Sequence, residues 1–217
     1  MENQDHILSA MPDDVAKRVK RDRLFLNNPV VMQGLGLAPL VVAATTVKNA
    51  AILAVALFLL LTPTRMLAAF LSRFSLFRFR GLTYAFSAAL VWMADWYILN
   101  LIFPSADLAL LGLYLPLLAA DPIVLKRYER PQRERIKTAF KKGVITSLGY
   151  ILALILTAAV REFLGAGMLY GHVILPFSLL PLAQLPSGGF ILVALIIAAW
   201  RGLAGAVKLQ MSGGAKG

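Results

Sequence analysis

Two carboxylates in apolar surroundings are the residues of this sequence whose chemistry most needs an explanation. Asp95 lies in "LVWMADWYIL" between Trp92 and Trp96, and Asp121 follows "YLPLLAA" and precedes Pro122. A carboxylate deep in a membrane is costly and is typical of an ion or proton site. The structural alternatives are an N-cap for Asp121 and a polar contact with a neighbouring helix or subunit for Asp95. The sequence leaves both interpretations open for each residue.

No other arrangement of residues is typical of catalysis or metal binding. The chain has no cysteine, which excludes cysteine-bound zinc and iron–sulfur clusters held by this chain alone. His172 is interpreted as structural or solvated, and Arg161 and Glu162 as a structural pair at a membrane interface. No catalytic residue and no metal site is identified. We therefore expect the chain to be a non-catalytic subunit of a larger complex.

The composition predicts an all-α polytopic membrane protein. The 217 residues are 59% hydrophobic and 15% charged, which is too apolar for a single water-soluble core. Arg65 and Arg201 lie near one end of their apolar segments, where long side chains can reach the lipid headgroups. Apolar runs of about 18–25 residues predict six membrane spans, at residues 29–47, 49–71, 82–103, 107–125, 143–160 and 190–207.

The basic residues predict the orientation of these spans. With both termini in the cytoplasm, only Lys48 and Arg161 of the 22 Lys and Arg residues lie outside, as the positive-inside rule requires. Residues 1–23 are then a charged cytoplasmic segment, and residues 24–217 are one membrane domain. The basic loop from Lys126 to Lys142 is interpreted as a topology signal that contacts anionic lipid rather than nucleic acid.

Two similar stretches predict an inverted repeat. Aligning "GLAPLVVAATTVK" with "YLPLLAADPIVLK" places Pro39 on Pro116, with three spans between them. The copies therefore enter the membrane from opposite sides, as repeats of about 29–104 and 107–210. Gly34, Gly36 and the two prolines are expected to break the first span of each repeat into half-helices. The alternative is a pair of ordinary proline kinks.

Three stretches resemble the small paired membrane subunits of the Rnf and Na+-NQR respiratory complexes, in particular the Rnf E-type and Nqr D-type branch. They are "NNPVVMQGLGLAPL" from Asn27, "GLYLPLLAADPIVL" from Gly112 and "REFLGAGMLYG" from Arg161. The resemblance extends over nearly the whole chain after residue 23. It implies a bacterial or archaeal cell (inner) membrane, two broken spans, and pairing with a homologous subunit of opposite orientation, the Rnf A-type.

The resemblance also implies a cofactor that this sequence cannot hold. In the family, each subunit contributes two cysteines, one in each broken span, to a 2Fe-2S cluster whose electron transfer is coupled to Na+ or H+ movement. Ala38 stands at the first of these positions and Pro122 aligns with the second. No cofactor is therefore expected to be bound by this chain alone, and a 2Fe-2S cluster in its complex is doubtful. Either the transmembrane electron path of the complex is organised differently, or the subunit has been diverted from electron transfer.

The leading hypothesis is an integral membrane subunit of an Rnf/Nqr-like ion-translocating electron-transport complex. The subunit would be structural or path-forming without its own 2Fe-2S ligands, with other redox subunits and membrane lipid as partners and no nucleic acid. The alternative is a small inverted-repeat secondary transporter or cation channel-like subunit, in which Asp95 or Asp121 contributes to the ion site. A subunit needed only for assembly is a third hypothesis.

Overall fold

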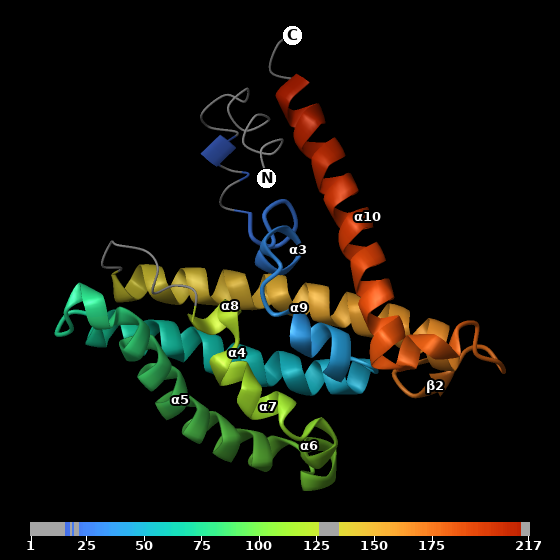
Figure 1. Ribbon diagram of the computed structural model, residues 1–217, viewed down its shortest axis with the longest axis horizontal. Coiled ribbons are helices and arrows are strands. Elements are labelled where there is room, and N and C mark those ends of the chain that lie inside the picture. Colours follow the sequence, from blue (N-terminus) through green and yellow to red (C-terminus); the bar gives the residue numbers. More distant parts are fainter. Residues whose placement is uncertain (1–15, 18, 20–21, 126–134, 214–217) are drawn as a thin grey trace.

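The computed structural model describes residues 16, 17, 19, 22–125 and 135–213, and the described chain is mostly helical (Figure 1). Most of the predicted cytoplasmic segment 1–23, and residues 126–134 of the basic loop, lie outside the described residues. Four of the described helices are long and apolar enough to cross a membrane. They are α4 (Val47–Leu71), α5 (Arg80–Ile102), α9 (Ile136–Ala166) and α10 (Pro186–Gly213). These helices correspond to the predicted spans 49–71, 82–103, 143–160 and 190–207.

The first predicted span, 29–47, is not one continuous helix. It consists of the short helix α3 (Pro29–Gln33) and a π-helix, η1 (Pro39–Ala43), each too short to cross a membrane. Gly34 and Gly36 separate the two pieces with φ angles of 67° and 72°. This left-handed conformation is accessible to glycine at little cost, and it ends the helix as the sequence predicted. By length and composition, the described residues therefore contain four helices that could cross a membrane, or five with the bent pair described next. The sequence predicted six such spans.

The fourth predicted span, 107–125, is also interrupted. It begins with α6 (Ser105–Leu111), and a 63° bend separates α6 from the segment Tyr114–Leu125. That segment comprises α7 (Tyr114–Leu117), the 3-10 turn η3 (Leu118–Ala120) and α8 (Pro122–Leu125). The bend is at Gly112, and Pro116 lies inside α7 rather than at the bend.

The helices α4 and α9 pack along each other and form the centre of the fold. The helix α5 packs on α4, and the short elements α3, η1 and α8 contact α4 or α9. Figure 1 shows α10 leaving the other helices at a steep angle. Fully buried side chains at the α4–α9 centre include Leu53, Leu57, Leu60, Tyr150 and Leu154. Both interrupted segments thus have a common rigid support.

The connection between α9 and α10 is irregular, because it is rich in glycine and proline. The helix α9 ends at Gly167, and a two-residue hairpin pairs β1 (Met168–Leu169) with β2 (His172–Val173). The 3-10 turn η5 (Pro181–Gln184) then leads to α10, and another 3-10 turn, η2 (Phe77–Phe79), joins α4 to α5. Pro181 and Pro186 each begin a helical element, where a missing backbone N–H costs nothing. His172 is exposed in the hairpin.

Candidate functional site

The start of the first interrupted segment is fixed by a buried asparagine. The Asn28 side-chain oxygen accepts hydrogen bonds from the Val30 and Val31 N–H groups, which caps α3. Its Nδ2 donates to the Gly149 carbonyl on α9 at 2.7 Å. Because Asn28 is fully buried, these bonds satisfy polar groups that neither lipid nor water reaches.

The break itself is held by a tyrosine of α9. The Tyr150 hydroxyl donates to the Gly36 carbonyl at 3.0 Å, and the tyrosine side chain is fully buried. A Cβ atom at Gly36 would overlap the Tyr150 ring. Glycine at this position is therefore required both by its backbone conformation and by the approach of the ring.

Arginines supply the donors that the interrupted helices lack. Arg201 Nε donates to the Val31 carbonyl at 2.7 Å, and its Nη2 donates to the Met32 carbonyl at 3.2 Å, at the end of α3. The neighbouring Trp200 stacks on Phe25, with ring centroids 5.4 Å apart. Carbonyl groups at a helix end need donors, and α10 brings Arg201 to those of α3.

Arg65 does not reach outward, as the sequence predicted it would. Its side chain is buried, and Nη1 donates to the Lys142 carbonyl at 2.8 Å and to Thr146 Oγ1 at 3.1 Å. Arg23 Nη1 donates to the same hydroxyl at 2.7 Å. The guanidinium of Arg65 thus links α4 to α9 within the protein.

Arg161 and Glu162 act on two different helix ends. Arg161 Nη1 donates to the Val41 carbonyl at 2.6 Å and to the Leu40 and Ala44 carbonyls at 3.3 Å, where η1 ends. Glu162 Oε2 accepts from the Val47 N–H at 2.7 Å, where α4 begins.

The predicted pairing of Arg161 with Glu162 is therefore corrected. Both side chains are buried within the described part of the chain, and no ion pair joins them. A helix carries partial negative charge at its carbonyl end and partial positive charge at its amide end. The guanidinium and the carboxylate each face the end of opposite charge, so both stabilise the junction between η1 and α4.

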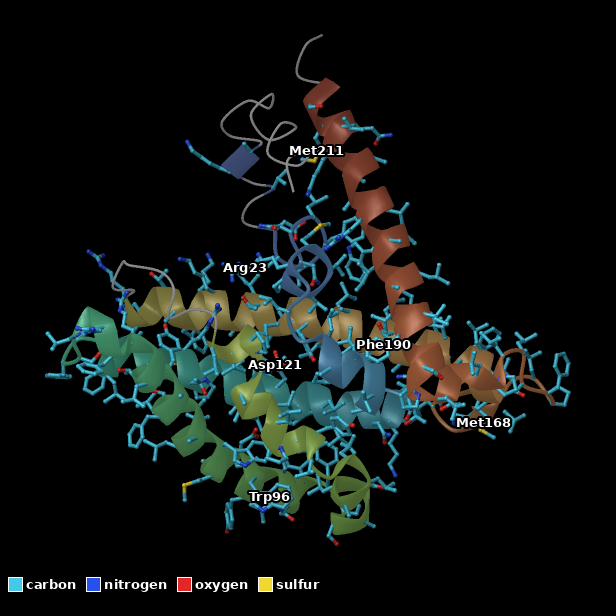
Figure 2. All side chains as sticks on the ribbon, viewed as in Figure 1. Arg23, Trp96, Asp121, Met168, Phe190 and Met211 are labelled. Atoms are coloured by element: carbon cyan, nitrogen blue, oxygen red, sulfur yellow. The ribbon has the colours of Figure 1, made fainter. Side chains whose placement is uncertain are left out.

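The second interrupted segment carries Asp121 at its second break. Asp121 Oδ1 accepts from the Ile123 N–H at 2.8 Å, which confirms the predicted N-cap of a helix that starts at Pro122. Asp121 is buried. Figure 2 shows Asp121 in the middle of the molecule, and the elements on either side of it, η3 and α8, pack on α4 and α5.

Asp95 lies on the buried face of α5 and is 1% exposed. Neither carboxylate oxygen has a hydrogen-bond partner among the described residues. The contact with a neighbouring helix that one interpretation expected is therefore not made within this part of the chain. Trp92 and Trp96 flank Asp95 with ring centroids 6.0 Å apart.

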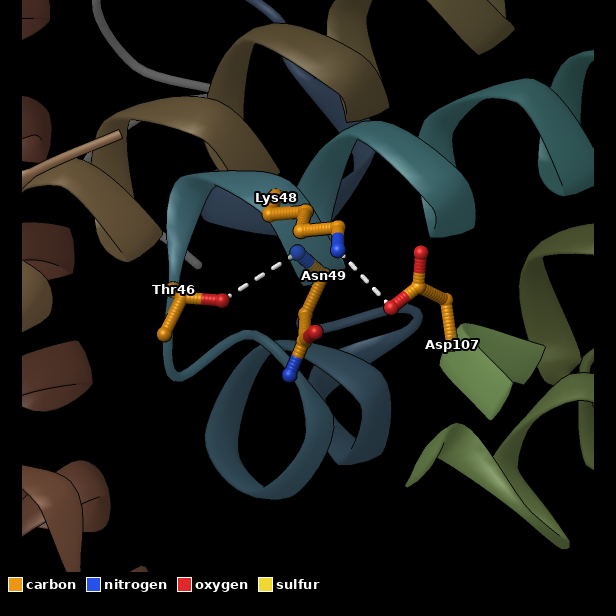
Figure 3. A network of polar contacts seen from close by, with 4 residues as sticks. All are labelled: Thr46, Lys48, Asn49 and Asp107. Atoms are coloured by element: carbon orange, nitrogen blue, oxygen red, sulfur yellow. Dashed lines mark hydrogen bonds and ion pairs between the residues drawn. The ribbon is translucent and has the colours of Figure 1, made fainter. Parts of the chain in front are cut away.

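An ion pair connects the start of α4 to α6, the first helix of the second interrupted segment. Lys48 Nζ lies 2.8 Å from Asp107 Oδ1 of α6, as Figure 3 shows. Beside it, Thr46 Oγ1 accepts from the Asn49 N–H and caps α4. The Lys48 side chain is 63% exposed, so the pair is a weak restraint in the presence of water.

The two positions that hold cysteine in the resembled family are exposed on this chain. Neither the Ala38 methyl group nor the Pro122 ring has an atom that binds iron. Among the described residues, no three His, Asp or Glu side chains are grouped as metal ligands. The residues present do not fit an iron–sulfur cluster bound by this chain.

Sequence reasoning missed most of the residues that hold the breaks. Tyr150 and Glu162 give no local signal, because each acts on backbone more than 110 residues away in the chain. Asn28 before Pro29 is a local signal for a helix start, but its bond to Gly149 is not. The sequence did offer two signals: an arginine inside an apolar segment at Arg201, and the charged pair Arg161 and Glu162 just after the fifth predicted span.

The chain is similar over most of its length to known membrane subunits. A family model described as "Rnf-Nqr subunit, membrane protein" matches residues 17–197. A protein of Shewanella frigidimarina, named as the E-type subunit of an ion-translocating oxidoreductase complex, is 30% identical over 194 residues, which cover 81% of this chain and 82% of the relative. Its namesake in Cellvibrio japonicus is 28% identical over 208 residues, 87% of this chain and 86% of the relative. From these matches and its apolar helices, this multi-pass membrane protein belongs to the Rnf-Nqr family of membrane subunits.

Proposed function

We propose that the chain is a membrane subunit of an ion-translocating oxidoreductase complex, and that it supports electron and ion transfer without ligands of its own for a 2Fe-2S cluster. The relatives are named as the E-type subunit of such a complex. The observation that carries the proposal is the pair of interrupted segments on the α4–α9 support, each with a former ligand position on its exposed side. The scaffold of a shared site is kept, while Ala38 and Pro122 supply no ligand.

The architecture assigned to this function is an inverted repeat of three plus three spans. In it, α3 with η1, α4 and α5 correspond to α6–α8, α9 and α10. The packing of α4 against α9 supports the assignment, because these are the second spans of the two repeats and would meet at the pseudo-twofold axis. The distribution of Lys and Arg supports cytoplasmic termini.

The partner assigned to the exposed sides of the interrupted segments is a homologous subunit of opposite orientation, of the Rnf A-type. Ala38 and Pro122 lie on surface that this chain leaves open. Apolar side chains on α5 and α10 are also exposed, including Leu82, Met93, Leu101, Phe190 and Leu195. Such surfaces are covered by lipid or by other subunits of the complex.

The ion pathway is assigned to Asp95 and Asp121. Both carboxylates are buried, and Asp95 has no hydrogen-bond partner among the residues that the structure describes. A carboxylate held in this way in a membrane has lost most of its solvation, and a bound proton or cation compensates for that loss. Asp121 lies at a break, where freed backbone groups offer further oxygen ligands.

Purification of the tagged full chain from membranes in mild detergent tests the proposal. We expect a homologous membrane subunit and redox subunits to copurify, and any iron at the membrane interface to be lost when the partner's cysteines are replaced. Isolation as a homodimer without redox proteins, or ion uptake by the chain alone in proteoliposomes, would contradict the proposal and favour a transporter.

A further inference from the structure

The guanidinium group of Arg161 is enclosed by backbone carbonyl groups. Besides the three carbonyls at the end of η1, Nε donates to the Ala183 carbonyl at 3.0 Å and Nη2 to the Gln184 carbonyl at 3.5 Å. The side chain is 0% exposed, and no carboxylate of the described residues forms an ion pair with it. The direct partners of the positive charge among the described residues are therefore neutral carbonyl oxygens, three of them at the end of η1.

This arrangement has the chemistry of a cation site. Unwound backbone and the carbonyl ends of half-helices coordinate monovalent cations in membrane proteins, because the oxygens replace water and the helix end carries partial negative charge. The oxygens of Leu40, Val41 and Ala44 converge in this way on one nitrogen of Arg161. Arginine is always protonated, so the cation in this site is never released.

The surroundings hold the guanidinium closely. A Cβ atom at Gly189, in the first turn of α10, would lie 2.7 Å from the Val41 oxygen and 2.9 Å from Arg161 Nη2. Because Gly189 has no side chain, α10 can pack directly against η1 and the guanidinium group of Arg161. Gln184 Nε2 also donates to the Arg161 carbonyl at 3.3 Å, which fixes η5 beside the site.

We infer that the end of η1 is a carbonyl-lined site for a monovalent cation, that the Arg161 side chain occupies it permanently, and that free guanidinium or an alkali-metal cation binds there once this side chain is removed. The inference goes beyond the proposed function, because it concerns the charge that stabilises one helix end and does not depend on redox partners. Its consequence for ion transfer is that a transported cation does not bind at the end of η1.

The test uses the full chain with Arg161→Ala, purified in mild detergent and unfolded by heat. We expect a lower midpoint temperature than in the wild type, and a saturable rise on addition of millimolar guanidinium chloride or of an alkali-metal chloride, as binding to the folded state requires. Choline chloride at equal ionic strength should produce no rise. Leu154→Ala is the matched control, since it removes a fully buried side chain of the same helix without changing charge, and its midpoint should not respond to guanidinium.

Two milder variants keep the inference falsifiable if Arg161→Ala does not fold. Arg161→Lys retains a positive charge and should have a higher midpoint than Arg161→Gln, and only Arg161→Gln should gain from guanidinium. Equal midpoints for the two variants would overturn the inference. So would an Arg161→Ala protein that responds to no cation, or a control that responds equally.

Discussion

Replacement of Gly36 by alanine tests how the first break is held. Alanine at a φ of 72° costs about 1–2 kcal/mol, because its Cβ approaches the following carbonyl in the left-handed region. The same Cβ would overlap the buried Tyr150 ring, and such overpacking costs about 1–3 kcal/mol. Gly36→Ala should therefore lower the free energy of unfolding by about 2–5 kcal/mol.

Gly34→Ala is a matched control for this experiment. Gly34 has a φ of 67°, but the nearest atom to its added Cβ would be Leu37 Cδ1 at 3.8 Å, which is ordinary contact. The control should show the backbone cost of about 1–2 kcal/mol alone. The difference between the two variants isolates the contact with Tyr150.

The free energies can be measured by titrating the purified chain from mild detergent into denaturing detergent and following tryptophan fluorescence. Tyr150→Leu should remove most of the extra cost of Gly36→Ala in a double-mutant cycle, since the ring that the Cβ meets is then absent. Equal destabilisation by Gly34→Ala and Gly36→Ala, or additive effects in the cycle, would refute the reasoning.

Variants at three further residues separate structural from ion-related roles. Asp121→Ala should lose the α8 cap and about 1 kcal/mol of stability in denaturant titrations. Asp121→Asn keeps an acceptor oxygen, so its stability should stay near that of the wild type. An Asn variant as unstable as the Ala variant would mean that the charge of Asp121 matters rather than the cap. Asp95→Val should fold at least as stably as the wild type, because it removes a buried carboxylate without a hydrogen-bond partner in the described chain, while ion transport by the intact complex should be lost. Transport that persists would exclude Asp95 from the pathway. Glu162→Gln removes the negative charge at the start of α4 and one of the two acceptor oxygens. Thermal unfolding should therefore show a free energy of unfolding that is lower by about 1–2 kcal/mol. Unchanged stability would show that this end of α4 needs no carboxylate.

Local features of the fold were predictable from the sequence. Apolar length identified α4, α5, α9 and α10, and paired glycines and prolines indicated an interruption in each half. The Asp121–Pro122 dipeptide predicted a helix start correctly, because a cap and the residue that follows it are neighbours in the chain. The limits of α9 were less predictable. The helix begins at Ile136, seven residues before the apolar run 143–160, because polar residues can continue a helix beyond its apolar part.

Features that depend on distant residues were not predictable. An arginine in an apolar segment has two ways to satisfy its donors, by reaching the headgroups or by binding backbone carbonyls. The sequence favoured headgroups for Arg65 and Arg201, because it does not say which carbonyls lie nearby. For Arg161, the acceptors are at Leu40, Val41 and Ala44, and only the packing of α9 against η1 brings them together.

The contacts of the first interrupted segment also determine when it can fold during synthesis. Asn28 needs Gly149, Gly36 needs Tyr150 and Val31 needs Arg201, at separations of 121, 114 and 170 residues. At about 5–20 residues per second, the last of these donors leaves the ribosome roughly 10–30 s after the segment itself. Until then the Val31 and Met32 carbonyls of α3 lack the donor that a lipid environment demands. The first segment to be translated is therefore the last to settle in the bilayer, and it must wait in the insertion machinery or at the membrane surface until α10 is made.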